Sequence, residues 1–157
     1  MKSHTISKAK DFSYSAHQGQ FRKDGKPYFT HVEAVAKIVD EEWDSFFKDS
    51  NSHRIWNPYK DNAVAAAYLH DVMEDCGVTR QDLIAVDIPE MVVDIVDALT
   101  KKEGETYFDF IMRIWSDNLW RQCTIAVKLA DLKHNMSDLK EGSLKDKYRF
   151  AAHILRS

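Results

Sequence analysis

Two strong metal-ligating residue types, His70 and Asp71, stand side by side in a stretch that otherwise predicts a buried helix. Three alanines and Leu69 stand shortly before the pair, and Val72 follows it. Burial of an ionised carboxylate beside an imidazole costs several kcal/mol unless another group compensates for it. A bound cation does so directly, because it neutralises the carboxylate and accepts the imidazole lone pair. The pair therefore predicts a metal site and indicates metal-dependent hydrolysis.

Two further residues, His31 and Asp131, complete a candidate ligand set with His70 and Asp71. The four residues belong to three separate predicted helices. Two imidazoles and two carboxylates suit a divalent ion such as Mn²⁺, Fe²⁺ or Zn²⁺ that keeps positions open for water or substrate, whereas a closed structural zinc site would contain thiolates. Taken singly, His31 also fits a surface or helix-capping residue, and Asp131 also fits a solvated helix face.

Glu74 and Asp75 lie four residues after His70 and Asp71. On one continuous helix they project from the same face as the candidate ligands. A carboxylate near a metal-bound water orients that water or takes its proton, so we predict catalytic roles for Glu74 and Asp75. The alternative is an acidic helix C-terminus, which the helix dipole disfavours.

Candidate substrate contacts come from two places in the chain. Lys128 and Asn135 flank Asp131 at spacings of three and four residues, so the three share one helix face. A cation and an amide beside a ligand could hold a phosphate or a base, although a solvated helix face is the alternative. The loop before His31 carries a basic cluster that either clamps an anion beside the metal or is simply solvated. The basic residues of this loop are Arg22, Lys23 and Lys26.

The remaining histidines have no partner at ligand spacing, and we expect them to be structural or exposed. Cys76 and Cys123 are too few for a disulfide scaffold, so they predict two reduced and partly buried thiols. The histidines without an expected ligand role are His4, His17, His53, His134 and His153.

Composition excludes several classes of protein. The chain has 157 residues, of which 44% are apolar and 30% charged, as in an ordinary single globular domain. The net charge of −3 gives no support for nucleic-acid binding through bulk positive charge. No apolar run approaches the ~20 residues of a membrane span, and the first residues do not resemble a signal peptide. We therefore expect a cytoplasmic protein.

Glycine and proline are scarce, and apolar residues recur at helical spacing nearly throughout. This pattern predicts an all-α fold in one domain over residues 1–157. Thr30 and Glu33 form a capping-box pattern, which starts a helix with His31 in its first turn. The aromatic-rich stretch 43–60 predicts a helix end and a long loop over 44–61. The other expected elements are a helix over 6–16, a loop over 17–29 with a turn at 24–25, a helix over 62–76 ended by Gly77, a helix capped by Thr79 and Asp82, a helix with Pro89 in its first turn, helices over 107–115 and 125–139, and a last helix capped by Ser143 with Asp146.

Three segments resemble a known family. Residues 22–31 read RKDGKPYFTH, residues 69–75 read LHDVMED, and residues 128–136 read KLADLKHNM. In this order they resemble the HD-domain metal-dependent phosphohydrolases. The closer similarity is to the (p)ppGpp hydrolase domain of RelA/SpoT homologues and its small stand-alone relatives. The resemblance implies a single-domain, all-α HD-fold helical bundle.

The resemblance also implies an activity and a division of roles. One Mn²⁺ would be bound by the four candidate ligands, and the substrate would be a small nucleotide. The implied reaction releases pyrophosphate from the 3′ position of ppGpp or pppGpp. The implied contacts are Glu74 and Asp75 to the attacking water, Arg22 and Lys23 to the nucleobase or phosphates, and Tyr28 and Asn135 to the nucleotide.

Two alternatives remain open from the sequence. The first keeps the metal and changes the substrate to NADPH, a nucleoside monophosphate or another phosphoester. The second is a non-catalytic HD-fold module that neutralises a toxin or regulates a partner, with the aromatic-rich stretch 43–60 as its contact surface. Activity against a nucleotide panel separates the two.

Overall fold

The computed structural model describes residues 3–116 and 119–157, and every regular element in this part of the chain is a helix. The expected all-α fold is therefore confirmed. An isolated bridge between Phe21 and Pro27 is the one β-type pairing recorded among these residues. The helices are α1 (His4–Ala16), α2 (Phe29–Glu41), η1 (Trp43–Phe46), α3 (Ser50–Trp56), η2 (Asn57–Tyr59), α4 (Lys60–Leu69), α5 (Val72–Asp75), α6 (Arg80–Ala85), α7 (Glu90–Ala98), α8 (Tyr107–Ser116), α9 (Arg121–Ser137) and α10 (Ser143–Arg156).

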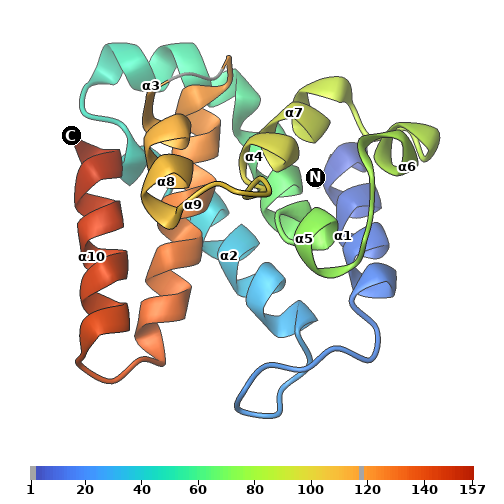
Figure 1. The fold of residues 1–157 in the computed structure, drawn as a ribbon. Coiled ribbons are helices and arrows are strands. Elements are labelled where there is room, and N and C mark those ends of the chain that lie inside the picture. Colours follow the sequence, from blue (N-terminus) through green and yellow to red (C-terminus); the bar gives the residue numbers. More distant parts are fainter. Residues whose placement is uncertain (1–2, 117–118) are drawn as a thin grey trace.

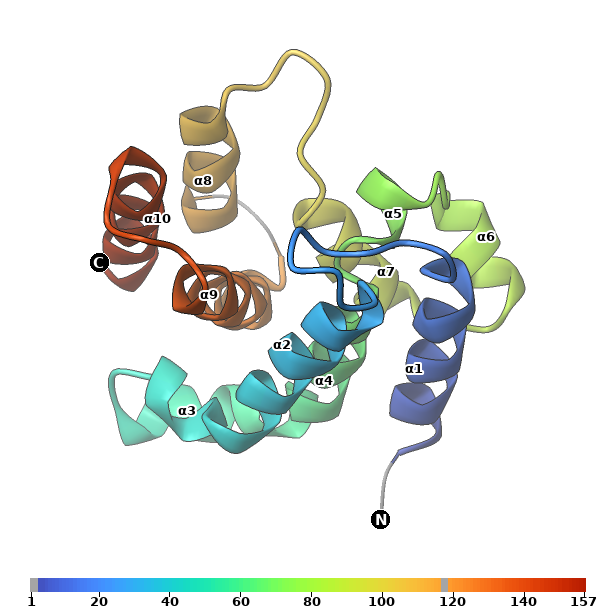
Figure 2. The ribbon, with the colours of Figure 1, turned by 90° about the horizontal axis from the view of Figure 1, so that it is seen from below.

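Helix α4 is the centre of the fold. All its residues from 63 to 69 are buried, and it packs against α1, α2, α7 and α9. A helix that is buried on every side must be apolar all round, and its four alanines allow its neighbours to approach closely. Figure 2 shows α2 lying between α1 and α9, so that α2, α4 and α9 form a contiguous group. This group supplies the platform for the candidate site.

One edge of the bundle gathers two connections that are distant in sequence. Figure 1 shows the loop that precedes α2 and the turn that joins α9 to α10 on the same, lower edge. The loop is held by backbone hydrogen bonds from Arg22 to Lys26 and from Tyr28 to Gln20, both 2.8 Å long. Gly25 adopts a left-handed φ of 87° in the turn, as the Asp-Gly pattern predicts.

Of the capping interactions predicted at Thr30 and Thr79, one is confirmed and the other is wrong. Thr79 and Asp82 form the expected reciprocal capping box of α6. The capping box expected from Thr30 is absent, because its hydroxyl donates to the Pro27 carbonyl and α2 begins at Phe29, with Tyr28 in the N-cap position. Glu33 forms an ion pair with Lys10 at 3.4 Å instead.

The last helix and the fifth expected helix also begin differently. Gly142, not Ser143, occupies the N-cap position of α10, and no side chain caps that helix. The Asp146 carboxylate pairs with Arg149 at 3.2 Å. Pro89 directly precedes α7 instead of lying in its first turn.

Two longer expectations need correction. The loop expected over 44–61 contains the short helices η1, α3 and η2. Trp43 is buried, and most of the other aromatic rings of the stretch pack against the core. The single helix expected over 62–76 is divided into α4 and α5, although Gly77 follows its end with the expected positive φ of 65°.

The structure also bears on the thiols and on membrane spans. Cys76 and Cys123 are both free, the first partly buried and the second buried, as expected.

Across residues 3–116 and 119–157, no helix combines the length and apolar character needed to cross a bilayer.

Candidate metal centre

The helix division falls at His70 and Asp71. His70 Nδ1 lies 2.6 Å from the Ala67 carbonyl oxygen, so this nitrogen carries the proton. In a continuous helix that carbonyl would accept from the amide of Asp71. Neighbouring helical residues also point about 100° apart, so the break allows both side chains to reach one cluster. The hydrogen bond to Ala67 orients the His70 ring and leaves Nε2 facing that cluster.

Helices α2 and α9 bring the other two candidate ligands to the same point. His31 lies in the first turn of α2, as expected, and its Nε2 is 2.9 Å from Asp131 Oδ1. His70 Nε2 is 3.0 Å from Asp71 Oδ2 and 3.3 Å from Asp131 Oδ1. One ligand atom from each residue lies within 4.8 Å of all the others. The four predicted ligands therefore form one compact cluster.

In the cation-free protein the carboxylates of this cluster are balanced by a proton on His70 and by the Lys128 ammonium. Burial lowers the pKa of His70, but the Asp71 and Asp131 carboxylates outweigh burial and leave that pKa well above its usual value. Burial favours neutral Asp131, yet the Lys128 ammonium and the two imidazoles hold the pKa of Asp131 well below its usual range. The buried His70 Nε2 makes no hydrogen bond of good geometry. Two imidazole nitrogens and two carboxylates fit a divalent metal ion, which would compete with the proton on His70.

Helix α9 surrounds Asp131 with two of its own residues. Lys128 Nζ lies 2.9 Å from Asp131 Oδ2, and Asn135 Nδ2 donates to Oδ1 at 3.1 Å. Lys128 is held over the ring of Phe110 at 5.1 Å, and its pKa is raised because Asp131 outweighs burial. The predicted face of Lys128, Asp131 and Asn135 is thus present, and its members hydrogen bond to one another.

The candidate catalytic carboxylates lie on α5. Burial raises the pKa of Asp75, with a further contribution from Asp71. Burial also raises the pKa of Glu74, whose Oε1 accepts from the Lys101 amide at 2.6 Å. A carboxylate with a raised pKa is a better proton acceptor near neutral pH. The helix break overturns the continuous-helix argument that placed Glu74 one turn after His70, whereas the backbone bond from Asp75 to Asp71 at 2.9 Å keeps those two one turn apart.

His134 is the residue that sequence reasoning missed. We expected it to have no partner near the cluster, yet its Nδ1 lies 2.7 Å from His31 Nδ1. Burial lowers the pKa of His134, and so does the nearby His31 ring. The available signal was the spacing of three residues between Asp131 and His134, which places both on neighbouring parts of α9.

Small-ligand sites typically have volumes of about 300–1,000 Å³, and a cavity of about 570 Å³ adjoins the cluster. Tyr28 and Asn135 belong both to its wall and to the cluster, because Tyr28 donates to Asp71 Oδ2 at 2.7 Å. Arg22 contacts Asn135 Oδ1 at 3.4 Å. Four of the five predicted substrate contacts line this cavity, whereas Lys128 does not. The lining residues are Phe21, Arg22, Lys23, Asp24, Tyr28, Asn135, Asp138, Leu139, Leu144 and Tyr148.

The fold and the cluster define a class of protein in which one histidine, a His-Asp pair and one aspartate converge from separate helical segments. A family model described as HD domain matches residues 9–118, which is more than half of the chain. The chain therefore belongs to the HD-domain family. The matched range includes His31, His70 and Asp71 and ends before Asp131.

Within this family, the chain is similar to proteins named for guanosine-3′,5′-bis(diphosphate) hydrolysis. The chain is 34% identical over 146 residues to the guanosine-3′,5′-bis(diphosphate) 3′-pyrophosphohydrolase of Haemophilus influenzae, covering 85% of this chain and 18% of that protein. It is 37% identical over 145 residues to the bifunctional (p)ppGpp synthase/hydrolase SpoT of Escherichia coli, with the same coverage of 85% and 18%. This chain thus spans about a fifth of the length of these relatives. A solved structure of a metazoan ortholog of SpoT matches with a TM-score of 0.71 and 21% identity, covering 99% of this chain and 85% of that one, which shows the shared fold.

Proposed function

We propose that residues 1–157 form one HD-type phosphohydrolase domain that holds a divalent cation through His31, His70, Asp71 and Asp131. The observation that carries this proposal is the convergence of four ligand atoms within 4.8 Å. Buried carboxylates at this separation are stable only with a compensating positive charge. Mn²⁺ is the ion that the family resemblance favours, and the donor set also suits Fe²⁺ or Zn²⁺.

We propose that the substrate is ppGpp or pppGpp, which would lose pyrophosphate from its 3′ position. The similarity to pyrophosphohydrolases and the cavity beside the cluster support this choice. Arg22 and Lys23 bring positive charge to the cavity wall, where a guanidinium can bind phosphate oxygens in a fork geometry. Tyr28 and Asn135, which bridge the cavity and the cluster, would orient the scissile phosphate toward the ligands.

Each residue has a separate part in the proposed reaction. When bound, the divalent ion would lower the pKa of a coordinated water and polarise the phosphoryl oxygen. Glu74 or Asp75 would align the attacking water and take its proton, as their raised pKa values favour. Lys128 would neutralise charge at Asp131 and so keep that carboxylate ionised.

The proposed function is tested with purified protein, Mn²⁺ and a panel of ppGpp, pppGpp, NADPH and deoxynucleoside monophosphates. We expect pyrophosphate release from ppGpp and pppGpp and no phosphate release from the monophosphates. Turnover of NADPH or a monophosphate alone would replace the substrate and keep the metal mechanism. Absence of turnover with every nucleotide would favour the binding module.

The inward packing of the aromatic side chains gives no support to a partner surface built from the stretch 43–60. Within the stretch 43–60, Ile55 is the large apolar residue that is exposed, with 53% of its surface accessible. One such residue is normal for a monomer and does not make an interaction patch. Enzymatic hydrolysis is therefore the function that the geometry supports best.

A further inference from the structure

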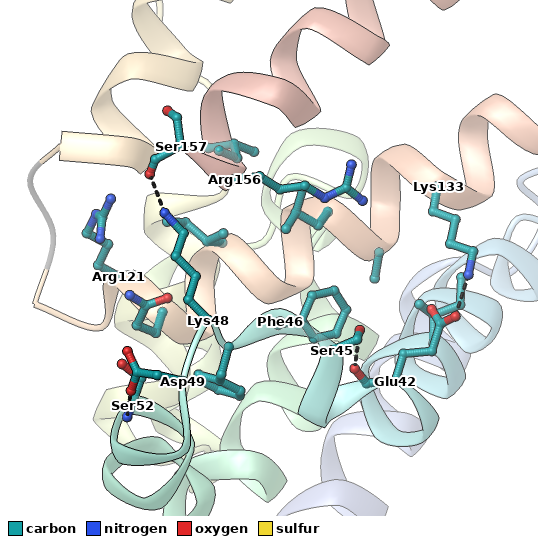
Figure 3. A pocket seen from close by; sticks show the side chains of 17 residues that line it. Glu42, Ser45, Phe46, Lys48, Asp49, Ser52, Arg121, Lys133, Arg156 and Ser157 are labelled. Carbon is teal, nitrogen blue, oxygen red and sulfur yellow. Dashed lines mark hydrogen bonds and ion pairs between the residues drawn. The ribbon is translucent and has the colours of Figure 1, made fainter.

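The stretch 43–60 forms one wall of a second cavity, away from the candidate metal centre. Figure 3 shows this cavity enclosed by the end of α2, the segment from η1 to α3, one face of α9 and the end of α10. Its volume is about 450 Å³. A cavity of this size holds a ligand as large as a nucleotide.

The cavity lies on the far side of α9 from the cluster. At 100° per residue, Lys133 and Leu129 are each about 200° from Asp131 around the helix axis, and Gln122 is about 180° from it. Lys133, Leu129 and Gln122 line this cavity, whereas Asp131 belongs to the cluster. None of its lining residues lines the cavity beside the metal centre. The two cavities are therefore separate sites.

The second cavity combines an apolar floor with a cationic rim. Phe46 supplies an aromatic ring, and Ile125, Leu129 and Leu155 supply aliphatic surface. The cations come from three segments, namely the connection between η1 and α3, helix α9 and the end of α10, and Figure 3 labels all of them. They are Lys48, Arg121, Lys133 and Arg156.

The two lining carboxylates are already engaged. Glu42 forms an ion pair with Lys133, and Asp49 caps α3 by accepting from the Ser52 amide at 2.7 Å. That cap lowers the pKa of Asp49, so the carboxylate is ionised and occupied. Neither acid neutralises the other three cations.

Three rim cations have no side-chain carboxylate partner among the residues that the structure describes. Lys48 donates to the main-chain oxygen of Ser157, the last residue of the sequence, at 3.0 Å. Arg121 is anchored by a bond from Nε to the Trp115 carbonyl and lies 5.5 Å over the Trp115 ring, and its terminal nitrogens have no hydrogen-bond partner within residues 3–116 and 119–157. The Arg156 guanidinium has no hydrogen bond or ion pair with the described residues at this end of α10. An anion at this rim would find one anchored guanidinium and one that has no side-chain partner within the described residues.

We propose that this cavity binds a phosphorylated small molecule of nucleotide size. The phosphates would pair with Arg121, Arg156 and Lys48, because guanidinium groups bind phosphate oxygens through paired N–H donors. The apolar part would lie on the floor against Phe46. The stretch 43–60 thereby acquires a role that the proposed hydrolysis does not give it.

The test is titration of the full chain with ADP in the presence of EDTA, followed by calorimetry and by amide chemical shifts. Removing divalent ions uncouples this binding from turnover, so the result does not depend on the proposed function. We expect saturable binding with shifts centred on Phe46, Gln122 and Arg156. The protein carrying Asp131→Ala should bind ADP equally well.

Two variants make the test specific. Gln122→Glu keeps the shape of the side chain, adds a negative charge to the cavity and suits the first turn of α9. Arg156→Gln removes a cation at an exposed helix end. Each should weaken ADP binding roughly tenfold, the loss expected for one charge-assisted contact. The control is Arg54→Gln, which removes an arginine of the stretch 43–60 that does not line the cavity. This variant should bind ADP with the affinity of the parent protein.

Three results would overturn the proposal. One is the absence of saturable binding at millimolar ADP. Another is unchanged affinity in both Gln122→Glu and Arg156→Gln proteins that melt at the parent temperature. The third is a set of shifts confined to Tyr28 and Asn135, which would assign the ADP to the cavity beside the metal centre.

Discussion

Two groups of side chains in this molecule use aspartates in opposite ways. On the surface, Arg80 joins α6 to α7 through Asp94 at 2.7 Å and Asp97 at 3.8 Å. Lys102 completes that group with a 2.8 Å contact to Asp97. The side chains of Arg80, Asp94 and Asp97 are each 37% exposed, so water shares in their solvation. Such pairs are complete by themselves and contribute about 0–1 kcal/mol each.

The buried cluster is balanced only through Lys128 and a proton on His70. Its two carboxylates lie close together, and His70 Nε2 has no hydrogen bond of good geometry. Side chains here are between 1% and 16% exposed, so water cannot screen their repulsion. The comparison teaches that a buried group of imidazoles and carboxylates whose charge balance depends on a proton at a ligand atom distinguishes a candidate binding site from a structural ion pair. The following predictions sharpen or break this distinction, from the largest expected effect to the smallest.

Asp131→Ala should abolish Mn²⁺ binding and turnover. It removes the carboxylate that both imidazoles and Lys128 contact, and it leaves the Lys128 ammonium without its buried partner. Calorimetric titration with Mn²⁺ and the pyrophosphate release assay measure the two losses. A folded Asp131→Ala protein that hydrolysed ppGpp as fast as the parent would exclude the proposed mechanism.

Glu74→Gln should separate chemistry from metal binding. The amide retains an oxygen for the Lys101 N–H, so the local structure should persist, but it cannot take a proton. Turnover should fall by about 10²-fold or more, while Mn²⁺ affinity stays at the parent value. The matched variant Asp75→Asn shows which of the two carboxylates accepts the proton. Parent-like rates in both variants would remove general-base roles from α5.

His134→Leu should weaken Mn²⁺ binding by about 10–100-fold, as expected for a group that orients a ligand. For His31 Nε2 to bind a metal, neutral His31 must carry its proton on Nδ1, so His134 Nδ1 must accept that proton's hydrogen bond. His134→Gln can supply an accepting oxygen and should recover part of the affinity. Equal affinity in the two variants would contradict the positioning role.

The stabilising effect of Mn²⁺ should increase with pH. In the cation-free protein the pKa of His70 is raised, so its stabilising contribution is complete below its unfolded-state pKa and disappears as pH rises through the folded-state value. The pKa of Asp131 is lowered, so its contribution to stability is present above its unfolded-state pKa and is lost as pH falls through the folded-state pKa. The Tm shift caused by Mn²⁺ should therefore be larger at about pH 8 than at about pH 6. A shift that decreased over this interval would contradict the competition between proton and metal.

Arg80→Ala should have the smallest effect. It breaks the half-exposed pairs with Asp94 and Asp97, so the free energy of unfolding should change by no more than about 1 kcal/mol. Mn²⁺ affinity should not change. Chemical denaturation and metal titration measure both quantities. A large loss of metal affinity would show that the surface pairs and the buried cluster are energetically coupled, and it would break the comparison.

Much of the site followed from the sequence because its ligands are distinctive residue types in unusual surroundings. His70 and Asp71 were conspicuous among small apolar residues, and His31 and Asp131 fitted the same donor chemistry. The capping box at Thr79 was also predictable, because that interaction involves residues three apart. Chemistry that is local, or that depends on residue type, can be inferred from one chain.

Contacts between distant segments could not be inferred in this way. The division between α4 and α5 arises because His70 bonds to the Ala67 carbonyl while it faces candidate ligands from α2 and α9. No glycine or proline marks that point. The partner of His134 is 103 residues away, so spacing along α9 alone did not reveal it. The Thr30 pattern failed because a carbonyl of the preceding loop offered its hydroxyl a competing acceptor.

The 100 residues that separate His31 from Asp131 give the cluster a mechanical meaning. A cation held by all four side chains would act as a removable cross-link, tying the start of one helix to the middle of another across most of the chain. Closing so long a loop costs the unfolded chain considerable entropy, and the ligation energy would offset it only in the folded state. Proteolytic resistance of the whole bundle would then depend on a single ion, so metal supply in the cell would govern how long the protein survives as well as how fast it works.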